Sequence, residues 1–354
     1  MSKSKLIFKG SSGCIFRPQI PCENSKKKRT KKRVSKLFIK KNKEYKIGLI
    51  VKKIKGFSDW TILWENVCQS PEYEKLLKNS EINECLLSQN IRPETLPQNY
   101  KFILYQGSYG GLTLENYSIK VIKQNIFNSE KLFIQMFKKI FKLLHNIFYG
   151  LMILNKNNIC HHDINRGNIL IKNNKSYIID YDISLEMDNL RDNNFLTQRM
   201  REEFNGYRIY DIYPYEYIYY ILKDKKEILN EQKNIALYQN RLNYYEDYEP
   251  IHHKLFDRDT DNLRFEYLED KLMGKKMDLD PLINKLDVYS LGMSIIILFI
   301  ERCEDYNIDI NECIKLFKLK DLKPYMDLIK DMTEFNSKDR ISIEEAYERY
   351  KNLI

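Results

Sequence analysis

Residues 161–170 of this chain read HHDINRGNIL, and residues 177–180 read YIID. These two stretches are the most informative of the chain, because they arrange Asp163, Asn168 and Asp180 around one short hairpin. The Ile-Leu-Ile and Tyr-Ile-Ile runs are strand-like, and the Asn-Asn-Lys between them has the composition of a tight turn. We predict a loop with two polar side chains, then a β-hairpin, then an aspartate where its second strand ends.

Two carboxylates and an amide at this spacing suit the transfer of a phosphoryl group. That group carries negative charge, so its transfer depends mainly on positioning and charge neutralisation. Asp180 and Asn168 offer the hard oxygen ligands that Mg²⁺ prefers, and Asp163 can accept the proton of an attacking hydroxyl. Asp and Asn in loops are more often turn formers, and we prefer that interpretation for Asn173 and Asn174.

Composition sets broad limits on the fold and the partners. The chain has 354 residues, 43% of them hydrophobic, which is enough for two lobes or domains with separate cores. Its net charge of +10 suits an anionic ligand such as ATP and does not by itself indicate nucleic acid.

The cysteines show no pattern of a metal site or a redox motif. They are Cys14, Cys22, Cys68, Cys85, Cys160, Cys303 and Cys313. No two form a C-x-x-C pair, so we predict reduced thiols. The first residues lack the apolar run of a signal peptide, and the longest apolar run, near residues 294–300, is too short to span a bilayer. We therefore expect a soluble intracellular protein without a membrane partner.

The N-terminal part reads as strand, turn and strand over residues 6–16, with G-S-S-G in the turn. A glycine turn lets backbone N–H groups approach phosphates, although a plain hairpin is its commoner meaning. The basic run Lys26–Arg33 is the only hint of a nucleic-acid partner or of nuclear localisation. We favour a solvated loop between two strands for this run, and nucleic acid as an unlikely partner.

A lysine and a glutamate follow at short range. Lys36 lies in an alternating strand over residues 33–39, and a helix with one apolar face is predicted over residues 41–55. Glu44 is the only acidic residue of that helix, which makes it the natural partner for Lys36. The alternative is a surface pair between Glu44 and Lys40, four residues before it.

The next landmark is a possible boundary between two domains. Residues 101–105 read as a buried strand, and Gln106–Gly111 reads as a flexible link. We place the boundary there, which gives domains at 1–106 and 107–354. A cleft between two such domains is a usual place for a cofactor.

The remainder is predicted to be mostly helical. Aromatic and aliphatic residues recur at helical spacing from 132 to about 154, and another very apolar helix begins near Lys285. A last helix is predicted from Ser342. Residues 217–280 form a long Tyr-, Lys- and Asp-rich insertion to which we assign no chemistry.

With these residues in view, the chain resembles a eukaryotic-type protein kinase, in particular the divergent Ser/Thr-kinase-like proteins of large nucleocytoplasmic DNA viruses. The resemblance runs from Gly10 to Arg340, apart from residues 217–280 and parts of 57–100. It implies an α+β bilobal fold, with a small β-rich N-lobe holding one main helix and a larger, mostly helical C-lobe. It also implies ATP and Mg²⁺ as cofactors and a protein hydroxyl, Ser or Thr, as the acceptor.

The resemblance carries over to individual residues. It implies Asp163 as the catalytic base, Lys36 as the lysine on the α- and β-phosphates with Glu44 as its partner, and Asn168 and Asp180 as metal ligands. The nucleotide contacts that it implies are Phe8, Lys9, Gly10, Ser11, Ser12, Gly13, Cys14, Ile15, Lys36, Gln106, Gly107 and Ser108. Among these, Gly10 and Gly13 match the second and third glycines of the phosphate-covering loop, and Phe8 replaces the first.

Further matches lie in the C-terminal part. Tyr213–Glu216 looks like a degenerate A-P-E, and Glu216 is expected to pair with Arg340. Residues 287–292 are similar to the D-x-W-S-x-G of the central helix of the C-lobe. There Asp287 is expected to accept backbone N–H bonds from the loop that holds Asp163.

Three positions depart from the family pattern. His162 replaces the arginine of H-R-D, which normally reads an activating phosphate. Asn165 replaces the lysine that is typical of Ser/Thr kinases. Asp182 replaces the glycine of D-F-G, where a side chain could alter metal affinity.

Two alternatives belong to other classes. A small-molecule kinase of the aminoglycoside or choline type shares the H-x-D-x-x-x-x-N pattern, although Asp287 and Arg340 are features of protein kinases. A catalytically weak pseudokinase, acting as an interaction scaffold, is favoured by Phe8 and Asp182 and opposed by the intact metal ligands.

Overall fold

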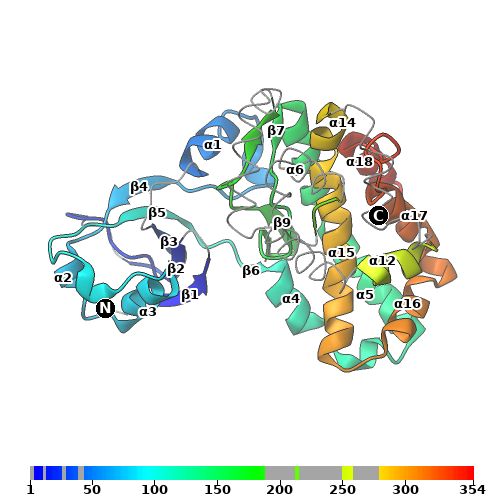
Figure 1. Cartoon of the computed structure of the whole chain (residues 1–354), viewed down its shortest axis with the longest axis horizontal. Helices are drawn as coiled ribbons and strands as arrows, with labels where there is room; N and C mark the ends of the chain where they lie inside the picture. The colour runs from blue at the N-terminus through cyan, green and yellow to red at the C-terminus, as the bar shows by residue number, and fades with distance from the viewer. Residues whose placement is uncertain are drawn as a thin grey trace, which may run out of the picture. The chain divides into compact units, whose positions relative to one another are not determined.

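The chain divides into two compact units, residues 1–111 with 179–183 and residues 112–178 with 184–354. Our computed structural model describes residues 4–10, 13–25, 29–38, 44–187, 212–214, 249–257 and 279–354. The first unit is rich in β-sheet and the second in helices (Figure 1). The predicted mixed α+β class is therefore confirmed.

The first unit is built on a five-stranded antiparallel sheet in the order β1-β2-β3-β5-β4. Its strands are β1 (Lys5–Lys9), β2 (Gly13–Arg17), β3 (Arg33–Phe38), β4 (Asn66–Gln69) and β5 (Ile103–Ser108). The predicted pair of strands around the glycine turn is confirmed as β1 and β2. Gln106 and Gly107, which we expected in a flexible link, lie inside β5 and pair with β3.

The two faces of this sheet have different neighbours. Cys14, Leu37 and Leu104 belong to a buried cluster with residues of α3 (Ser80–Ser88), and Tyr73 and Leu76 of α2 (Tyr73–Leu76) join the same cluster. Directly opposed residues in an antiparallel pair share a face, and side chains alternate along a strand. The other face therefore carries a row that runs from strand to strand: Phe8, Ile15, Lys36, Tyr105 and Val67.

The helix predicted over residues 41–55 is shorter in the structure. It is α1, Glu44–Val51, and residues 41–43 lie outside the described part of the chain. After Val51 the backbone bonds tighten, as in Ile54 N–H to Val51 O at 3.0 Å. Gly56 then takes a left-handed φ of 76°, and the short helices η1 (Phe57–Asp59) and, further along, η2 (Pro93–Thr95) follow.

The second unit contains two small sheets. β6 (Leu112–Thr113) pairs with β8 (Ile169–Lys172), which pairs with β9 (Lys175–Ile178), and β7 (Ile159–Cys160) pairs with β10 (Leu185–Glu186). Asn173 and Asn174 join β8 to β9 with φ of 51° and 58°. Left-handed values at both central residues define the hairpin turn that Asn tolerates well, so the predicted hairpin is confirmed.

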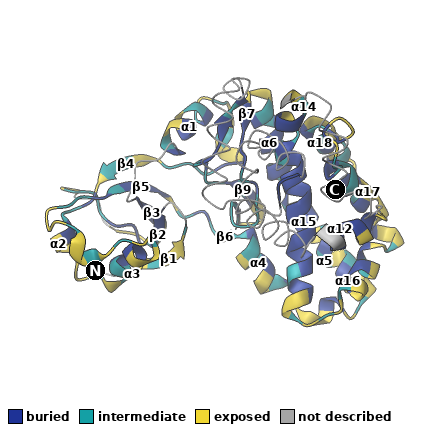
Figure 2. Cartoon of the chain, viewed as in Figure 1, coloured by how far each residue is buried: buried dark blue, intermediate teal, exposed yellow. Residues whose placement is uncertain are grey.

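Helices make up most of the second unit. Its described helices are α4 (Leu114–Val121), η3 (Gln124–Ile126), α5 (Glu130–Leu143), α6 (His145–Lys156), α12 (Glu249–Phe256), α14 (Leu279–Asn284), α15 (Leu286–Asp305), α16 (Ile310–Phe317), η4 (Lys320–Leu322), α17 (Lys323–Met332) and α18 (Ile343–Lys351). α15 is buried along most of its length, as its apolar sequence predicts (Figure 2). α18 begins after Ser342, whose hydroxyl accepts the Glu345 N–H, so this predicted start is confirmed.

One long helix was predicted over residues 132–154, and the structure has two. α5 ends and α6 begins around Leu144, which has φ −81° and ψ 5°. There the Leu144 N–H bonds to Phe141 O, three residues back, instead of continuing the α-helical ladder. No Gly or Pro marks this position, so the hydrophobic period alone could not locate the break.

The prediction that all the cysteines are reduced thiols is wrong in this structure. Three disulfides join Cys14 to Cys85, Cys22 to Cys68 and Cys303 to Cys313, and Cys160 is a buried free thiol. The partners are 71, 46 and 10 residues apart. Tertiary packing brings them together, and C-x-x-C spacing gives no information about such pairs.

Within the described residues, no helix combines the length and the apolar character that crossing a membrane requires. Of the insertion at 217–280, the structure describes α12 and the first residues of α14. The segment 29–32 of the basic run precedes β3 as an exposed loop, in agreement with the favoured interpretation, and Lys26–Lys28 lie outside the description.

Candidate functional site

Lys36 lies at the centre of the first unit's sheet. It is directly opposite Ile15 on one side and Tyr105 on the other, and it is only 3% exposed. A lysine at a central strand position loses nearly all its hydration, which is costly unless carboxylates replace the water. The contacts of its ammonium group therefore define the site.

Glu44 provides the first of these contacts. It is the first residue of α1, and its Oε2 lies 2.9 Å from Lys36 Nζ. The pairing that we predicted from the sequence is confirmed as a contact, with both side chains 4% exposed. The alternative partner, Lys40, lies outside the described residues.

Asp180 provides the second contact. Lys36 Nζ donates to both of its carboxylate oxygens, at 3.2 Å each. Asp180 follows β9 with a left-handed φ of 65°, a conformation that is uncommon for residues other than glycine and mostly found with Asn or Asp. The next residue, Tyr181, is buried, and its hydroxyl lies 2.9 Å from Thr61 Oγ1.

Two carboxylates thus share one buried ammonium group, and the pKa values of Lys36 and Glu44 are both shifted. Burial alone would lower the pKa of Lys36, but Glu44 and Asp180 outweigh it and raise that pKa. Burial raises the pKa of Glu44 to about 7, against the opposing pull of Lys36. Lys36 stays charged at neutral pH, and Glu44 can take up a proton near neutral pH.

The loop at residues 161–168 positions a second set of groups, in the second unit. Asn165 Nδ2 donates to Asp163 Oδ1 and Asn168 Nδ2 donates to Asp163 Oδ2, each at 2.8 Å. Both oxygens of Asp163 are therefore oriented by amides. Because its nitrogen faces Asp163, Asn168 has its Oδ1 as the atom that can bind a cation.

The N-terminus of α15 supports this loop. Asp287 Oδ2 accepts the His161 N–H at 2.7 Å, and Oδ1 accepts the His162 N–H at 2.8 Å. The predicted bracing role of Asp287 is confirmed. Such charge-assisted bonds are among the stronger contacts in proteins, so they fix the backbone just before Asp163.

His162 is buried and its surroundings differ from those of a phosphate-reading arginine. Its ring stacks on Tyr213 with centroids 5.2 Å apart, and Tyr213 Oη donates to the His162 carbonyl at 2.8 Å. His162 also has a left-handed φ of 67°. The aromatic stack gives this histidine a packing role inside the second unit.

The glycine turn is partly described. Gly10 N–H bonds to Gly13 O at 2.9 Å, and Ser11 and Ser12 lie outside the described residues. A Cβ on Gly13 would lie 2.3 Å from Leu37 O, so close packing against β3 already requires glycine there. Phe8 is 47% exposed.

The other predicted nucleotide contacts differ in their surroundings. Ile15 shares its face of the sheet with Lys36, whereas Cys14 faces the core and is tied to Cys85. Lys9 pairs with Glu84 at 2.6 Å. The structure brings Ile15 to Lys36 and directs Cys14 away from it.

Residues 106–108 are engaged by their own unit. Gln106 O accepts the Glu65 N–H at 2.8 Å, and its side chain donates to Ile20 O at 2.7 Å. Ser108 Oγ donates to Glu65 Oε1 at 2.7 Å. Gln106 and Ser108 pair with neighbouring strands as part of β5. The flexible link expected from Gln106 is therefore wrong for residues 106–108.

Arg340 is 1% exposed in the second unit. It donates to Glu334 O at 2.7 Å and to Phe335 O at 2.8 Å, and it lies over the Tyr289 ring. Its expected partner Glu216 lies outside the described residues, so that pairing stays a prediction.

Sequence reasoning missed the role of Trp64. Its Nε1 donates to Glu44 Oε1, the oxygen that does not bind Lys36. No motif marks this residue, because its contact with Glu44 depends on how the chain folds between α1 and β4. Its rarity was the one available signal, because the chain has only two tryptophans.

Among the described residues, no group of three or more His, Cys, Asp and Glu side chains is arranged to hold a metal ion. Asp180 and the Oδ1 of Asn168 have the oxygen chemistry that suits Mg²⁺, which commonly takes one or two protein ligands together with phosphates and water. The comparisons with known proteins add no assignment: no protein-family model matches the chain, and no curated protein matches it.

Proposed function

We propose that this protein is an ATP-dependent protein kinase that transfers the γ-phosphoryl group to a Ser or Thr hydroxyl of a protein substrate. The observation that carries the proposal is the buried cluster in which Lys36 Nζ meets Glu44 at 2.9 Å and Asp180 at 3.2 Å. Burying a lysine between two carboxylates carries a desolvation cost, and such buried, perturbed groups cluster at functional sites. A fixed ammonium group beside a carboxylate that can bind a metal suits the phosphates of a nucleoside triphosphate.

The residues would divide the chemistry as follows. The Lys36 ammonium would donate to phosphate oxygens, held in place by Glu44. Asp180 and Asn168 would hold Mg²⁺, which neutralises charge on the phosphates when bound. Asp163 would accept the hydroxyl proton on a carboxylate oxygen as that hydroxyl attacks.

Two further observations favour a protein kinase over a small-molecule kinase. Asp287 accepts two backbone N–H bonds from the loop before Asp163, and Arg340 is buried and bonded to nearby carbonyls. Both positions were singled out by the resemblance to protein kinases. Asn165, where that family has lysine, donates to Asp163 and so keeps a bond to the proposed base.

The test is phosphate transfer from γ-labelled ATP with Mg²⁺. The purified chain is given generic protein substrates in one arm and a panel of aminoglycosides and choline in the other, with Lys36→Met as the control. We expect label on Ser or Thr of protein that is absent with Lys36→Met. Label only on small molecules would reject the protein acceptor, and ATP binding without any transfer would indicate a pseudokinase.

A second test addresses the metal. Asp180→Ala should weaken ATP binding much more with Mg²⁺ than without it, because Asp180 is proposed to bind the metal and not the nucleotide directly. Calorimetric titration with and without Mg²⁺ measures both affinities. Equal losses in the two conditions would reject the metal role.

A further inference from the structure

The chain between α1 and β4 contacts Glu44, one acidic partner of Lys36, and Tyr181, the residue that follows the other partner, Asp180. This connecting segment, residues 60–65, is anchored at its end: Lys52 Nζ donates to Trp64 O at 2.6 Å, and Glu65 N–H donates to Gln106 O at 2.8 Å. Trp60, at its start, is fully buried. The segment is therefore held between α1 and the sheet within the first unit.

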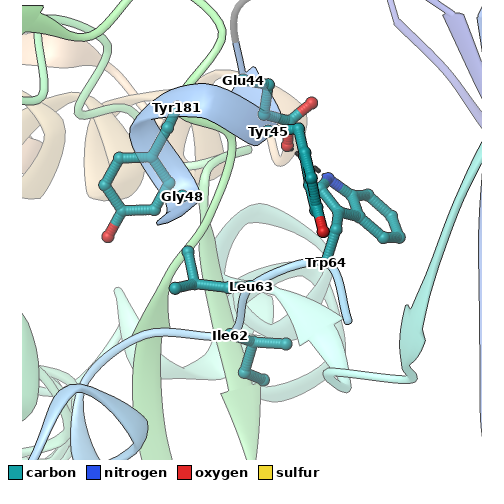
Figure 3. A pocket seen from close by; sticks show the side chains of 7 residues that line it. All are labelled: Glu44, Tyr45, Gly48, Ile62, Leu63, Trp64 and Tyr181. Atoms are coloured by element: carbon teal, nitrogen blue, oxygen red, sulfur yellow. Dashed lines mark hydrogen bonds between the residues drawn. The ribbon is translucent and has the colours of Figure 1, made fainter. Parts of the chain in front are cut away.

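The first contact from this segment reaches Glu44. One carboxylate oxygen of Glu44 accepts from Lys36 and the other accepts from the indole N–H of Trp64. Figure 3 shows the Trp64 indole nitrogen beside the Glu44 carboxylate, in a small pocket lined also by Tyr45 and Leu63. A buried carboxylate held at both oxygens cannot rotate without losing a bond, and losing one costs free energy.

The second contact reaches the segment that carries Asp180. Thr61 Oγ1 lies 2.9 Å from the hydroxyl of Tyr181, and Tyr181 follows Asp180 directly. Asp180 has a left-handed φ of 65°. Unusual backbone conformations persist where surrounding contacts fix them, and the anchored Tyr181 side chain supplies such a contact.

We propose that the connecting segment sets the geometry around Lys36, with Trp64 positioning Glu44 and Thr61 positioning Asp180 through Tyr181. This inference rests on the proposed function and adds two positioning residues to it. Groups from four parts of the first unit act on Glu44. They are Lys36 of β3, Asp180, Trp64 of the connecting segment and Tyr105 of β5. Trp64 is the neutral group of that set whose bond to Glu44 the structure shows, so it fixes Glu44 without competing for the charge of Lys36.

Trp64→Phe tests the first contact, with Trp60→Phe as the matched control. Phe keeps an aromatic ring beside Tyr105 but removes the N–H donor. The indole N–H of Trp60 has no hydrogen-bond partner in the described structure, so the same substitution there removes bulk alone. We expect Trp64→Phe to lower kcat/KM for ATP about 10- to 100-fold, as for a lost bond to a charged group. KM for the protein substrate should not change.

A double-mutant cycle separates positioning from general destabilisation. If Trp64 acts through Glu44, adding Trp64→Phe to Glu44→Met should cost nothing further in kcat/KM for ATP. Trp60→Phe should lower the melting temperature, and its loss in kcat/KM for ATP should be clearly smaller than that of Trp64→Phe. Full additivity of the two losses, or kinetics of Trp64→Phe equal to those of Trp60→Phe, would overturn the inference.

Thr61→Val and Tyr181→Phe test the second contact. Each removes one hydroxyl of a buried pair, so each should weaken Mg²⁺-dependent ATP binding by about 2- to 10-fold, and the double variant should be no weaker than the singles. Losses that multiply in the double variant would show that the two hydroxyls do not act together.

One readout does not depend on catalysis. Trp60→Phe leaves Trp64 as the single tryptophan, so its emission reports on the Glu44 contact directly. Adding Glu44→Met should shift that emission, and an unchanged spectrum would overturn the contact. A wild-type protein that transfers no phosphate would reject the proposed function, and the emission result would still decide whether Trp64 holds Glu44.

Discussion

At the scale of single residues, the balance of charge at Lys36 governs the site. One ammonium faces Glu44 and Asp180, so the cluster carries one excess negative charge when all three are ionised. Burial is the main reason why Glu44 has a pKa raised to about 7, and the negative charge of Asp180 adds to that rise. A cation that binds Asp180 would relieve the excess charge.

This predicts a dependence of nucleotide binding on pH. Glu44 is ionised above pH 7 and takes up a proton as the pH falls through about 7, which releases its hold on Lys36. ATP affinity should therefore be highest above pH 7 and decline as the pH falls below it. Calorimetric titrations between about pH 6 and about pH 8.5 measure the ATP affinity. This range brackets the raised pKa of Glu44.

Glu44→Gln is the matched control for this pH dependence. It keeps an acceptor for Trp64 and cannot titrate, so its ATP affinity should vary little across the same range. A wild-type profile with the same shape as that of Glu44→Gln would contradict the assignment of the titration to Glu44.

At the scale of elements, the first turn of α15 holds the loop that bears Asp163. Replacing Asp287 with alanine leaves the His161 and His162 N–H groups without their carboxylate. We expect the free energy of unfolding to fall by roughly 3 kcal/mol, the cost of losing charge-assisted bonds to buried donors. Urea denaturation of the purified variant measures the loss.

An exposed ion pair of the second unit offers a control. Asp327 of α17 pairs with Lys323 at 2.8 Å, and both side chains are more than half exposed. Removing an exposed ion pair should cost less than about 1 kcal/mol. Equal losses for Asp287→Ala and Asp327→Ala would show that the N-terminal bonds do not support the loop.

The disulfides join elements that are distant in sequence, and they give a direct chemical test. Denatured protein without reductant should show one reactive thiol, Cys160, and seven after reduction. Separately, Cys85→Ser should lower the free energy of unfolding by about 2–4 kcal/mol, because it opens a closure between β2 and α3. Seven thiols before reduction would instead support the reduced state predicted from the sequence.

Local patterns predicted elements well and their ends poorly. The hairpin β8–β9 follows from two apolar runs around Asn173 and Asn174, and all of that information lies within ten positions. The break at Leu144 accompanies the tertiary contacts that each helix makes. For example, Phe137 stacks on Phe299 and Phe148 stacks on Tyr350. The spacing of hydrophobic residues does not show where α5 ends and α6 begins.

At the scale of the whole molecule, a site residue could be predicted where a short-range sequence pattern or the family resemblance pointed to it. Lys36 and Glu44 are eight residues apart and were paired from the strand and helix patterns. Asp287 lies 126 residues from His161, and its role was predicted only through the family resemblance. The contact of Trp64 with Glu44 and the three disulfides depend on tertiary packing, so the sequence could not reveal them.

The most direct test of the central claim compares the wild-type protein with Asp163→Asn at saturating Mg²⁺ and ATP. Asparagine keeps the shape of the side chain but cannot accept the hydroxyl proton. Single-turnover transfer of labelled γ-phosphate should be roughly 10²–10⁴ times slower in the variant, while its ATP affinity stays near that of the wild type. Equal transfer rates in the two proteins would contradict the account, since Asp163 would then have no part in the chemistry.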